Sequence, residues 1–377
     1  MRHFSFSRFL AILAKEFIQM RRDRLTFGMM MGVPLMQLML FGYAINTDPK
    51  NLPAVAVVAE NSVFARSLLQ AMQNTGYIRF DGPPVDEATA DLMLREGDVQ
   101  FAVHIPPNFA TDLVRGKKPA LLVEADATDP VATGNALSAL QGLDTSALVH
   151  DLKGPLADIG KGGGAFEVRL HKRYNAEGIT QYNIVPGLMG VVLTMTMVMM
   201  TSLAVTRERE RGTMENLLAM PVQPAEVMLG KMLPYIAVGY VQVAIIVVAA
   251  RYLFAVPLAG SLTLLSVAAI VFIAANLAVG FTFSTLSTNQ LQAMQMSTFF
   301  FLPSLLLSGF MFPFRGMPLW AQVIGEALPL THFLRIVRGI LLKGNGWIEI
   351  WPDLWPIGLF LLAAAILALF RYRRTLD

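Results

Sequence analysis

Residues Tyr252–Phe314 read YLFAVPLAGSLTLLSVAAIVFIAANLAVGFTFSTLSTNQLQAMQMSTFFFLPSLLLSGFMFPF, which is 63 residues without one Asp, Glu, Lys or Arg. A helix of about 20 apolar residues crosses the hydrocarbon core of a bilayer, so this stretch is long enough for two crossings. The polar run at residues 284–290 predicts the turn between them. We therefore expect membrane-spanning helices at residues 262–283 and 291–311.

The composition of the whole chain agrees with a membrane protein. The chain has 377 residues, of which 54% are hydrophobic and only 15% are charged, and its mean hydropathy is +0.52. The hydrophobic fraction and the mean hydropathy are above those of ordinary soluble proteins, and the charged fraction is below theirs. The absence of cysteine excludes a disulfide framework, a thiolate metal site and a cysteine nucleophile.

Four further apolar windows are long enough, or nearly long enough, to span a bilayer, which gives six spans in total. They occupy residues 25–47, 178–206, 232–250 and 352–370. Residues 1–24 carry apolar side chains at helical spacing among basic ones, which predicts an amphipathic helix at the membrane surface. A cleaved signal peptide is the alternative for this segment, but Lys15 and Glu16 interrupt the apolar core that such a peptide needs.

Basic residues in short loops mark the cytoplasmic side of a membrane protein. They gather before the first span, after the second and after the last, so an even number of spans places both termini in the cytoplasm. The remaining segments are then a cytoplasmic loop (207–231), a cytoplasmic tail (371–377), a large extracytoplasmic domain (48–177) and an extracytoplasmic segment of short helices (312–351).

The large insertion alternates short β-branched runs, such as residues 54–58 and 99–103, with helical patterns. This alternation predicts a small α+β domain. The predicted fold class is therefore a polytopic α-helical membrane protein with six transmembrane helices, an N-terminal amphipathic interfacial helix and an inserted α+β extracytoplasmic domain.

The chain contains no phosphate-binding loop. Such a loop ends in Gly-Lys-Ser/Thr, whereas Gly230 and Lys231 are followed by Met232 at a membrane boundary. If nucleotide hydrolysis drives this protein, a separate subunit must therefore bind the nucleotide.

Residues 206–221 read TRERERGTMENLLAMP and follow the second predicted span. The segment is densely charged, then amphipathic, and ends at a proline, which is typical of a short surface helix that docks on a partner protein. The alternative is a solvated loop whose arginines only follow the positive-inside rule.

The same segment resembles the signature of type-2 ABC (ABC-2) exporter permeases, with its Glu-x-Glu-x-Gly-Thr-x-Glu core, leucine pair and following proline. Residues 307–313, 317–320, 328–331 and 338–339 provide a second match. The resemblance covers the whole chain, and the large domain between the first two spans is similar to the drug-exporter branch of the family.

The resemblance implies a dimer of permeases, either a homodimer or a pair of related chains, bound to two cytoplasmic ATPase subunits that carry the ATP and magnesium. The chain itself would hold no cofactor and no metal, and would have no catalytic residue. Its coupling helix would contact the ATPase through Glu208, Glu210, Gly212, Thr213, Glu215, Leu217, Leu218 and Pro221. Residues 1–24 would correspond to the connecting helix of the family.

The resemblance also implies that residues 312–343 form re-entrant helices that gate the exit. The gate candidates are Pro313, Glu326, Pro329, His332, Arg335 and Arg338. Structural ion pairs are the alternative role of the charged ones. Candidates for a translocation path, with plain interhelical packing as the alternative, are Gln181, Met197, Asn276, Gln295, Phe299 and Ser304.

The sequence thus predicts the permease subunit of an ATP-driven exporter of drugs or other amphipathic molecules in the bacterial inner membrane. The external domain is expected to contact a periplasmic adaptor or to guide substrate, and nucleic acid is not an expected partner. The alternative is a non-transporting membrane scaffold or sensor with a ligand-binding external domain. A membrane-embedded enzyme is disfavoured because the apolar windows carry no acid, base or metal-ligand set.

Overall fold

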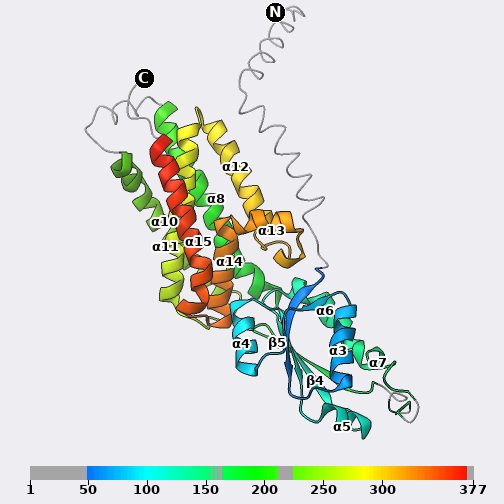
Figure 1. The fold of residues 1–377 in the computed structure, drawn as a ribbon. Coiled ribbons are helices and arrows are strands. Elements are labelled where there is room, and N and C mark those ends of the chain that lie inside the picture. The colour runs from blue at the N-terminus through cyan, green and yellow to red at the C-terminus, as the bar shows by residue number, and fades with distance from the viewer. Residues whose placement is uncertain (1–48, 154–155, 158, 160–163, 211–223, 372–377) are drawn as a thin grey trace, which may run out of the picture.

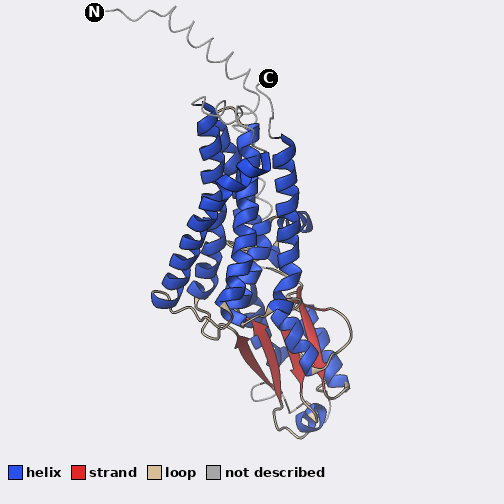
Figure 2. Cartoon of the chain, turned by 90° about the vertical axis from the view of Figure 1, so that its left-hand side faces the viewer, coloured by secondary structure: helices blue, strands red, loops and turns tan. Residues whose placement is uncertain are grey.

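The structure is a computed structural model that describes residues 49–153, 156–157, 159, 164–210 and 224–371. It has two parts: an elongated bundle of helices and an α+β domain attached to one end of the bundle (Figures 1 and 2). The predicted amphipathic helix at 1–24 and the predicted span at 25–47 lie outside the described residues.

The α+β domain contains a five-stranded mixed sheet with the order β2-β1-β3-β4-β5. The β3–β4 pair is antiparallel, and the other neighbouring pairs are parallel. Because side chains alternate along a strand, Leu52 and Ala54 of β1 face one hydrophobic core and Val55 faces another. The strands are β1 (Leu52–Val58), β2 (Ile78–Phe80), β3 (Phe101–Ile105), β4 (Ala120–Asp126) and β5 (Glu167–Arg173).

Helices cover both faces of this sheet. Those on the larger core are α3 (Val63–Asn74), α5 (Phe109–Val114), α6 (Pro130–Gln141) and α7 (Leu143–Ser146). The opposite face is covered by α4 (Glu87–Glu96), which begins where Asp86 accepts a hydrogen bond from the Thr89 amide and ends at Gly97, a left-handed residue with φ of 83°. Helix α4 thus lies beside the sheet and also contacts the helical bundle (Figure 1).

The bundle is built around α11, which packs against both α8 and α15. Four of its helices contain stretches long and apolar enough to cross a membrane: α8 (Thr180–Glu210), α10 (Pro224–Tyr252), α11 (Leu262–Leu286) and α15 (Trp347–Arg371). A shorter helix of 18 residues, α12 (Gln290–Leu307), lies beside α8. The described residues therefore form a polytopic helical architecture.

Several helices differ in length from the apolar windows in the sequence. Helix α8 continues four residues past the predicted end at 206, α15 begins five residues before the predicted start at 352, and α10 begins at Pro224 instead of 232. Hydropathy marks where a helix meets lipid, whereas hydrogen bonding sets where it ends. Helix α12 ends earlier than predicted, at Leu307, because Gly309 with φ of 82° turns the chain.

A hairpin of short helices joins α12 to α15, and we call residues 308–346 the junction hairpin. It contains a 3₁₀ turn η3 (Phe314–Gly316), α13 (Leu319–Glu326), α14 (Pro329–Arg338) and a π-helical turn η4 (Gly339–Lys343). Proline fits the start of a helix, where its missing N–H is not needed, and Pro329 begins α14 in this way. Phe333 of α14 stacks on Phe272 of α11 with ring centroids 4.0 Å apart, so the hairpin is inserted into the end of the bundle.

Candidate functional site

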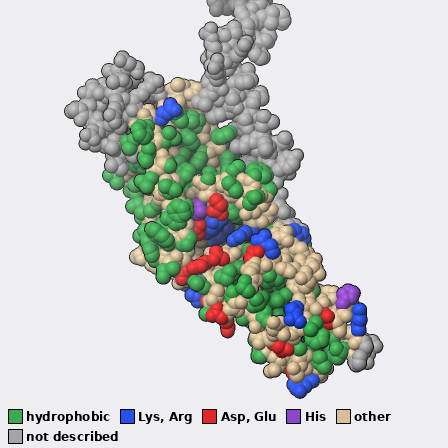
Figure 3. All heavy atoms as spheres, viewed as in Figure 1, with side chains coloured by type: hydrophobic (Ala, Val, Ile, Leu, Met, Phe, Trp, Pro, Cys, Tyr) green, Lys and Arg blue, Asp and Glu red, His purple; other side chains and the backbone are tan. Residues whose placement is uncertain are grey.

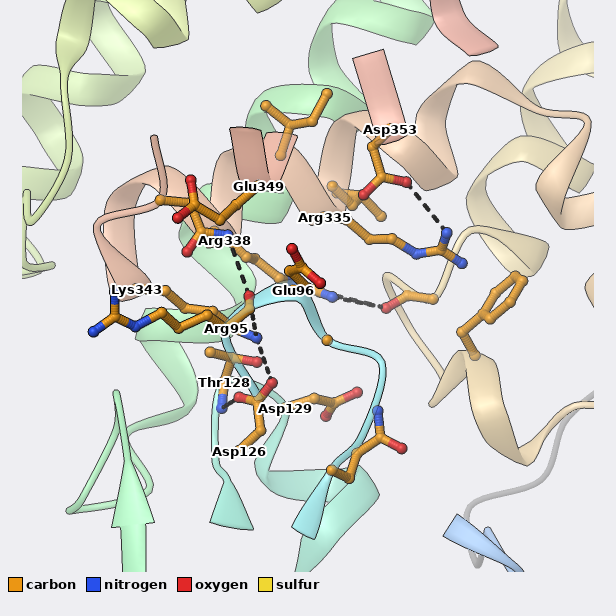
Figure 4. A pocket seen from close by; sticks show the side chains of 18 of the residues that line it. Arg95, Glu96, Asp126, Thr128, Asp129, Arg335, Arg338, Lys343, Glu349 and Asp353 are labelled. Atoms are coloured by element: carbon orange, nitrogen blue, oxygen red, sulfur yellow. Dashed lines mark hydrogen bonds and ion pairs between the residues drawn. The ribbon is translucent and has the colours of Figure 1, made fainter. Parts of the chain in front are cut away.

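Charged side chains gather where the junction hairpin meets the α+β domain (Figure 3). They surround a cavity of about 160 Å³ (Figure 4). Its polar lining includes Arg95, Glu96, Gln100, Asp126 and Asp129 from the domain, Arg315, Arg335, Arg338, Lys343 and Asn345 from the junction hairpin, and Glu349 and Asp353 from α15. We call this cavity the junction cavity.

A buried ion pair between Lys343 and Asp126 joins the two parts of the protein. Its Nζ and Oδ2 atoms lie 2.6 Å apart, and the two side chains are only 8% and 7% exposed. Asp126 also accepts a hydrogen bond from the Thr128 amide at 3.1 Å. Because a charge this deeply buried is costly without a partner, each member of the pair constrains the position of the other.

The C-terminal end of α4 provides the second attachment. The Leu94 carbonyl accepts a hydrogen bond from Lys343 at 3.0 Å, and the Gly97 carbonyl accepts one from Arg315 at 3.1 Å. Asn345 donates to the Arg95 carbonyl at 3.3 Å. The last carbonyls of a helix lack intrahelical partners and carry partial negative charge, so cations from the hairpin suit them.

Three of the predicted gate residues form one network. His332 Nδ1 lies 2.7 Å from Asp353 Oδ1, and its Nε2 lies 2.9 Å from the Glu326 carbonyl. Arg335 pairs with the carboxylates of Glu326 and Asp353, the latter at 3.3 Å. Burial by itself would lower the pKa of Arg335, but the bond to Glu326 and the charge of Asp353 raise it above its usual value. The network ties α13, α14 and α15 together.

The other gate candidates make no contact of this kind with the network. Pro313 and Pro329 are buried at the starts of η3 and α14. Arg338 lines the junction cavity, and both its Nη atoms lie 3.3 Å from the Gly309 carbonyl. No carboxylate of the described chain is within ion-pair distance of Arg338, and burial lowers its pKa.

At the opposite end of the bundle, the structure describes one coupling candidate in full. Glu210 is the last residue of α8, and its Oε1 accepts a hydrogen bond from the Gln290 amide at 2.7 Å, where α12 begins. Hydrogen bonds from Gln290 lower the pKa of Glu210. The side chain of Glu208 and residues Gly212, Thr213, Glu215, Leu217, Leu218 and Pro221 lie outside the described part of the chain.

The translocation-path candidates have different environments. Met197 is fully buried in the bundle core, whereas 43% of Phe299 is exposed. Gln181 is exposed at the start of α8. Asn276 and Ser304 are buried and donate hydrogen bonds to carbonyls of their own helices, and the Oε1 atom of Gln295 is buried without a partner. The structure does not bring these six residues together at one site.

The junction cavity is lined by residues that the sequence analysis did not identify as site residues. The pairing of Lys343 with Asp126 and the contacts of Arg315 and Asn345 with α4 were not predicted. One feature of the sequence could have identified Lys343. This lysine directly follows the apolar run Ile340–Leu342 and precedes Gly344. A lysine next to buried apolar residues normally needs a partner of opposite charge.

Comparisons with known proteins give a consistent result. The model of the family described as ABC-2 family transporter protein matches residues 24–370. The Escherichia coli K12 protein named probable multidrug ABC transporter permease YbhS is 28% identical over 96% of this chain and 95% of its own length. The inner membrane transport permease YhhJ of the same strain is 31% identical over 78% of this chain and 79% of its own. ABC transporter G family member 20 of Dictyostelium discoideum is 25% identical over 96% of this chain but only 50% of its own length.

Proposed function

Because the chain belongs to the ABC-2 family of transporter proteins, we propose that it is the permease subunit of an ATP-driven exporter and works with a separate cytoplasmic ATPase. The name of the similar protein YbhS includes multidrug transport, which supports drugs or other amphipathic molecules as the substrate class. The complex would export them across the inner membrane. This chain contributes the membrane path and no catalytic residue.

The continuity of α8 is the observation that carries this proposal. The helix has 31 residues, which corresponds to a length of about 46 Å. One end is Glu210, within the charged segment with the coupling signature. Near the other end, added Cβ atoms at Gly187 and Gly190 would lie 2.6 Å from Phe310 and Leu330 of the junction hairpin. One continuous helix thus connects the segment proposed to receive the ATPase stroke with the hairpin proposed to gate the exit.

The proposal includes a topology with six spans. Among the described residues, four helices are long and apolar enough to cross a membrane, and α12 runs beside α8. Residues 25–47 supply the sixth apolar window. Both termini and the loop at 207–231 face the cytoplasm in this topology. The α+β domain and the junction hairpin face the periplasm.

The proposed assembly contains two permeases, as a homodimer or with a related chain, and two ATPase subunits that hold ATP and magnesium. The acidic residues of the coupling segment act in it as mechanical contacts. Residues 1–24 form the connecting helix, and the α+β domain meets a periplasmic adaptor or guides substrate.

Copurification tests the proposal directly. The full chain is purified from native membranes, copurifying proteins are identified, and ATP hydrolysis is measured with and without Glu215→Arg. We expect an ABC ATPase to copurify with the wild type and Glu215→Arg to abolish the stimulated activity. The matched control is Glu177→Arg, a charge reversal at an exposed residue between β5 and α8, which should leave the activity unchanged.

The orientation is tested by thiol labelling, for which the chain is well suited because it has no cysteine of its own. A single cysteine introduced at Glu215 should be protected from a membrane-impermeant reagent in intact cells, whereas one at Glu177 should react. Labelling of the Glu215 position from outside would refute the proposed coupling role. The alternative function is a scaffold or sensor. In that case no ATPase whose activity depends on residues 208–215 would copurify with the chain.

A further inference from the structure

The junction cavity contains two arginines with unused hydrogen-bonding capacity. A guanidinium has five N–H donors. The described partners of Arg315 and Arg338 are single backbone carbonyls, those of Gly97 and Gly309. The Nε atom of Arg338 is inaccessible to solvent and makes no hydrogen bond. Burial lowers the pKa of the Arg338 guanidinium, whereas carboxylates raise the pKa of Arg335 nearby.

Two of the carboxylates that line the cavity are already paired with other cations, and none of the described lining carboxylates is within ion-pair distance of Arg315 or Arg338. Asp126 pairs with Lys343, and Asp353 pairs with Arg335. Glu349 accepts a hydrogen bond from the Gly346 amide at the start of α15.

Asp129 accepts hydrogen bonds from the Val131 amide and from Asn183. Glu96 is the lining carboxylate without a hydrogen bond or an ion pair among the described residues, and it is exposed at the edge of the cavity. The lining therefore offers spare donors on Arg315 and Arg338.

The cavity also has the size and the unsatisfied polar atoms expected of a binding site. Its volume of about 160 Å³ would hold on the order of ten water molecules. Gln100 Oε1 and Asn345 Oδ1 are buried without partners, and Asn345 is only 9% exposed. Buried polar groups in native proteins are normally satisfied, so unpaired ones beside a cavity indicate a polar occupant.

We propose that the junction cavity binds a phosphate headgroup carried on an apolar tail, with Arg315 and Arg338 as its donors. Guanidinium groups suit phosphate because their N–H donors match its oxygens in pairs. Arg315 is exposed at the rim, whereas Arg338 lies deeper, so the headgroup would pass the first to reach the second. Gln100 and Asn345 would accept hydrogen bonds from a protonated oxygen of the headgroup or from an accompanying water.

The position of the cavity identifies the sources of such a group. It lies between the apolar bundle and the α+β domain (Figures 3 and 4). A molecule with one apolar and one polar end could place the apolar end against the bundle and the polar end in the charged cavity. An exported amphiphile and a membrane lipid share this chemistry. The assignment of the site to an exported molecule rests on the proposed exporter function, whereas the recognition of phosphate does not.

The test is a binding measurement on the full-length chain in nanodiscs of phosphatidylcholine, with radiolabelled dodecyl phosphate as the probe and empty nanodiscs as the blank. Saturable binding is expected. Arg315→Gln and Arg338→Gln should each weaken it by about tenfold or more, the scale of a charge-assisted hydrogen bond. Glu96→Gln should tighten it, because removal of that charge relieves repulsion of the anion.

The control is Arg169→Gln, which removes an arginine of β5 that is 63% exposed and paired with Glu167 outside the cavity. Its binding should equal that of the wild type. If Arg338→Gln fails to fold, Arg315→Gln at the exposed rim decides the test. Binding by both cavity variants within twofold of the wild type overturns the proposal, and so does an equal loss in Arg169→Gln.

Competition distinguishes the sources. Displacement of the probe by inorganic phosphate means that the headgroup alone is recognised, and displacement by phosphatidic acid in the nanodisc identifies a lipid. Displacement by inorganic phosphate but not by phosphatidic acid points to an exported amphiphile that is not a membrane lipid. Saturable binding that neither competitor displaces overturns the proposal, because the probe would then be held by its apolar tail alone. No part of this experiment uses the ATPase. The binding result therefore stands even if copurification contradicts the exporter proposal.

Discussion

Lys343 and Asp126 form a buried ion pair of 2.6 Å between residues that lie 217 positions apart in the chain. Lys343 ends the π-helical turn after α14, and Asp126 ends β4. The pair therefore joins the junction hairpin to the α+β domain. With the hydrogen bonds from Lys343, Arg315 and Asn345 to the end of α4, it holds the domain in one orientation on the junction hairpin.

Lys343→Met should destabilise the protein by about 3–5 kcal/mol, because it leaves the buried carboxylate of Asp126 without its counter-charge. The double variant Lys343→Met with Asp126→Asn should recover part of this loss. Thermal unfolding in detergent is the measurement. Lys117→Met, which removes an exposed lysine paired with Asp112, is the matched control and should change stability by less than about 1 kcal/mol. Equal effects of the two lysine variants would contradict the structural role of the pair.

Glu210→Ala should lower the ratio of transport to ATP hydrolysis by about twofold to tenfold, because it removes the hydrogen bonds that link the end of α8 to the start of α12. Copurification of the ATPase should persist if other residues of the coupling segment hold it. Both rates are measured on one reconstituted preparation, with Glu177→Ala as the control. An unchanged ratio would show that this link transmits no motion.

Gly280→Ala should destabilise the bundle by about 1–3 kcal/mol, because the added Cβ would lie 2.5 Å from the Val198 carbonyl of α8. Gly358→Ala in α15 is the matched control, since an added Cβ there meets nothing within 4 Å. That substitution should be neutral or stabilise the helix by up to about 1 kcal/mol. In thermal unfolding, Gly280→Ala should therefore lower the melting temperature, whereas Gly358→Ala should leave it unchanged or raise it. No loss of stability in Gly280→Ala would rule out the close approach of α8 and α11.

Tyr174 predicts a change of stability at alkaline pH. Burial raises the pKa of its hydroxyl to about 12, above the usual value near 10. Between these values the unfolded chain releases the proton while the folded protein keeps it, so stability should fall as the pH rises from about 10 to about 12. Tyr174→Phe should remove this contribution, and it should cost little at neutral pH because the hydroxyl oxygen is buried without a hydrogen bond. Identical stability profiles of the two proteins over this pH range would contradict the prediction.

The helical part of the fold was largely predictable, because the signal lies within each helix. An uninterrupted apolar stretch such as Leu262–Leu286 forms a helix because its backbone groups must be hydrogen-bonded within the segment. Its apolar side chains must be surrounded by lipid or by other helices. Proline acts locally in the same way. Pro318 and Pro329 lie at the starts of α13 and α14, because proline does not fit the interior of a helix. Helix ends at charged residues, such as Glu210, were less predictable because hydropathy does not report them.

The sequence by itself determined that this is a multi-helix membrane protein of the ABC-2 family with an inserted α+β domain, because apolar length and a local motif are properties of contiguous residues. Only the tertiary structure decided which charges meet. Lys343 and Asp126 are brought together by the seating of α4 and β4 on the junction hairpin, as are Arg335 and Asp353 by the packing of α14 on α15. No periodic pattern in the sequence identifies the partner of a charged side chain. Its pairing therefore follows from the three-dimensional packing of distant segments.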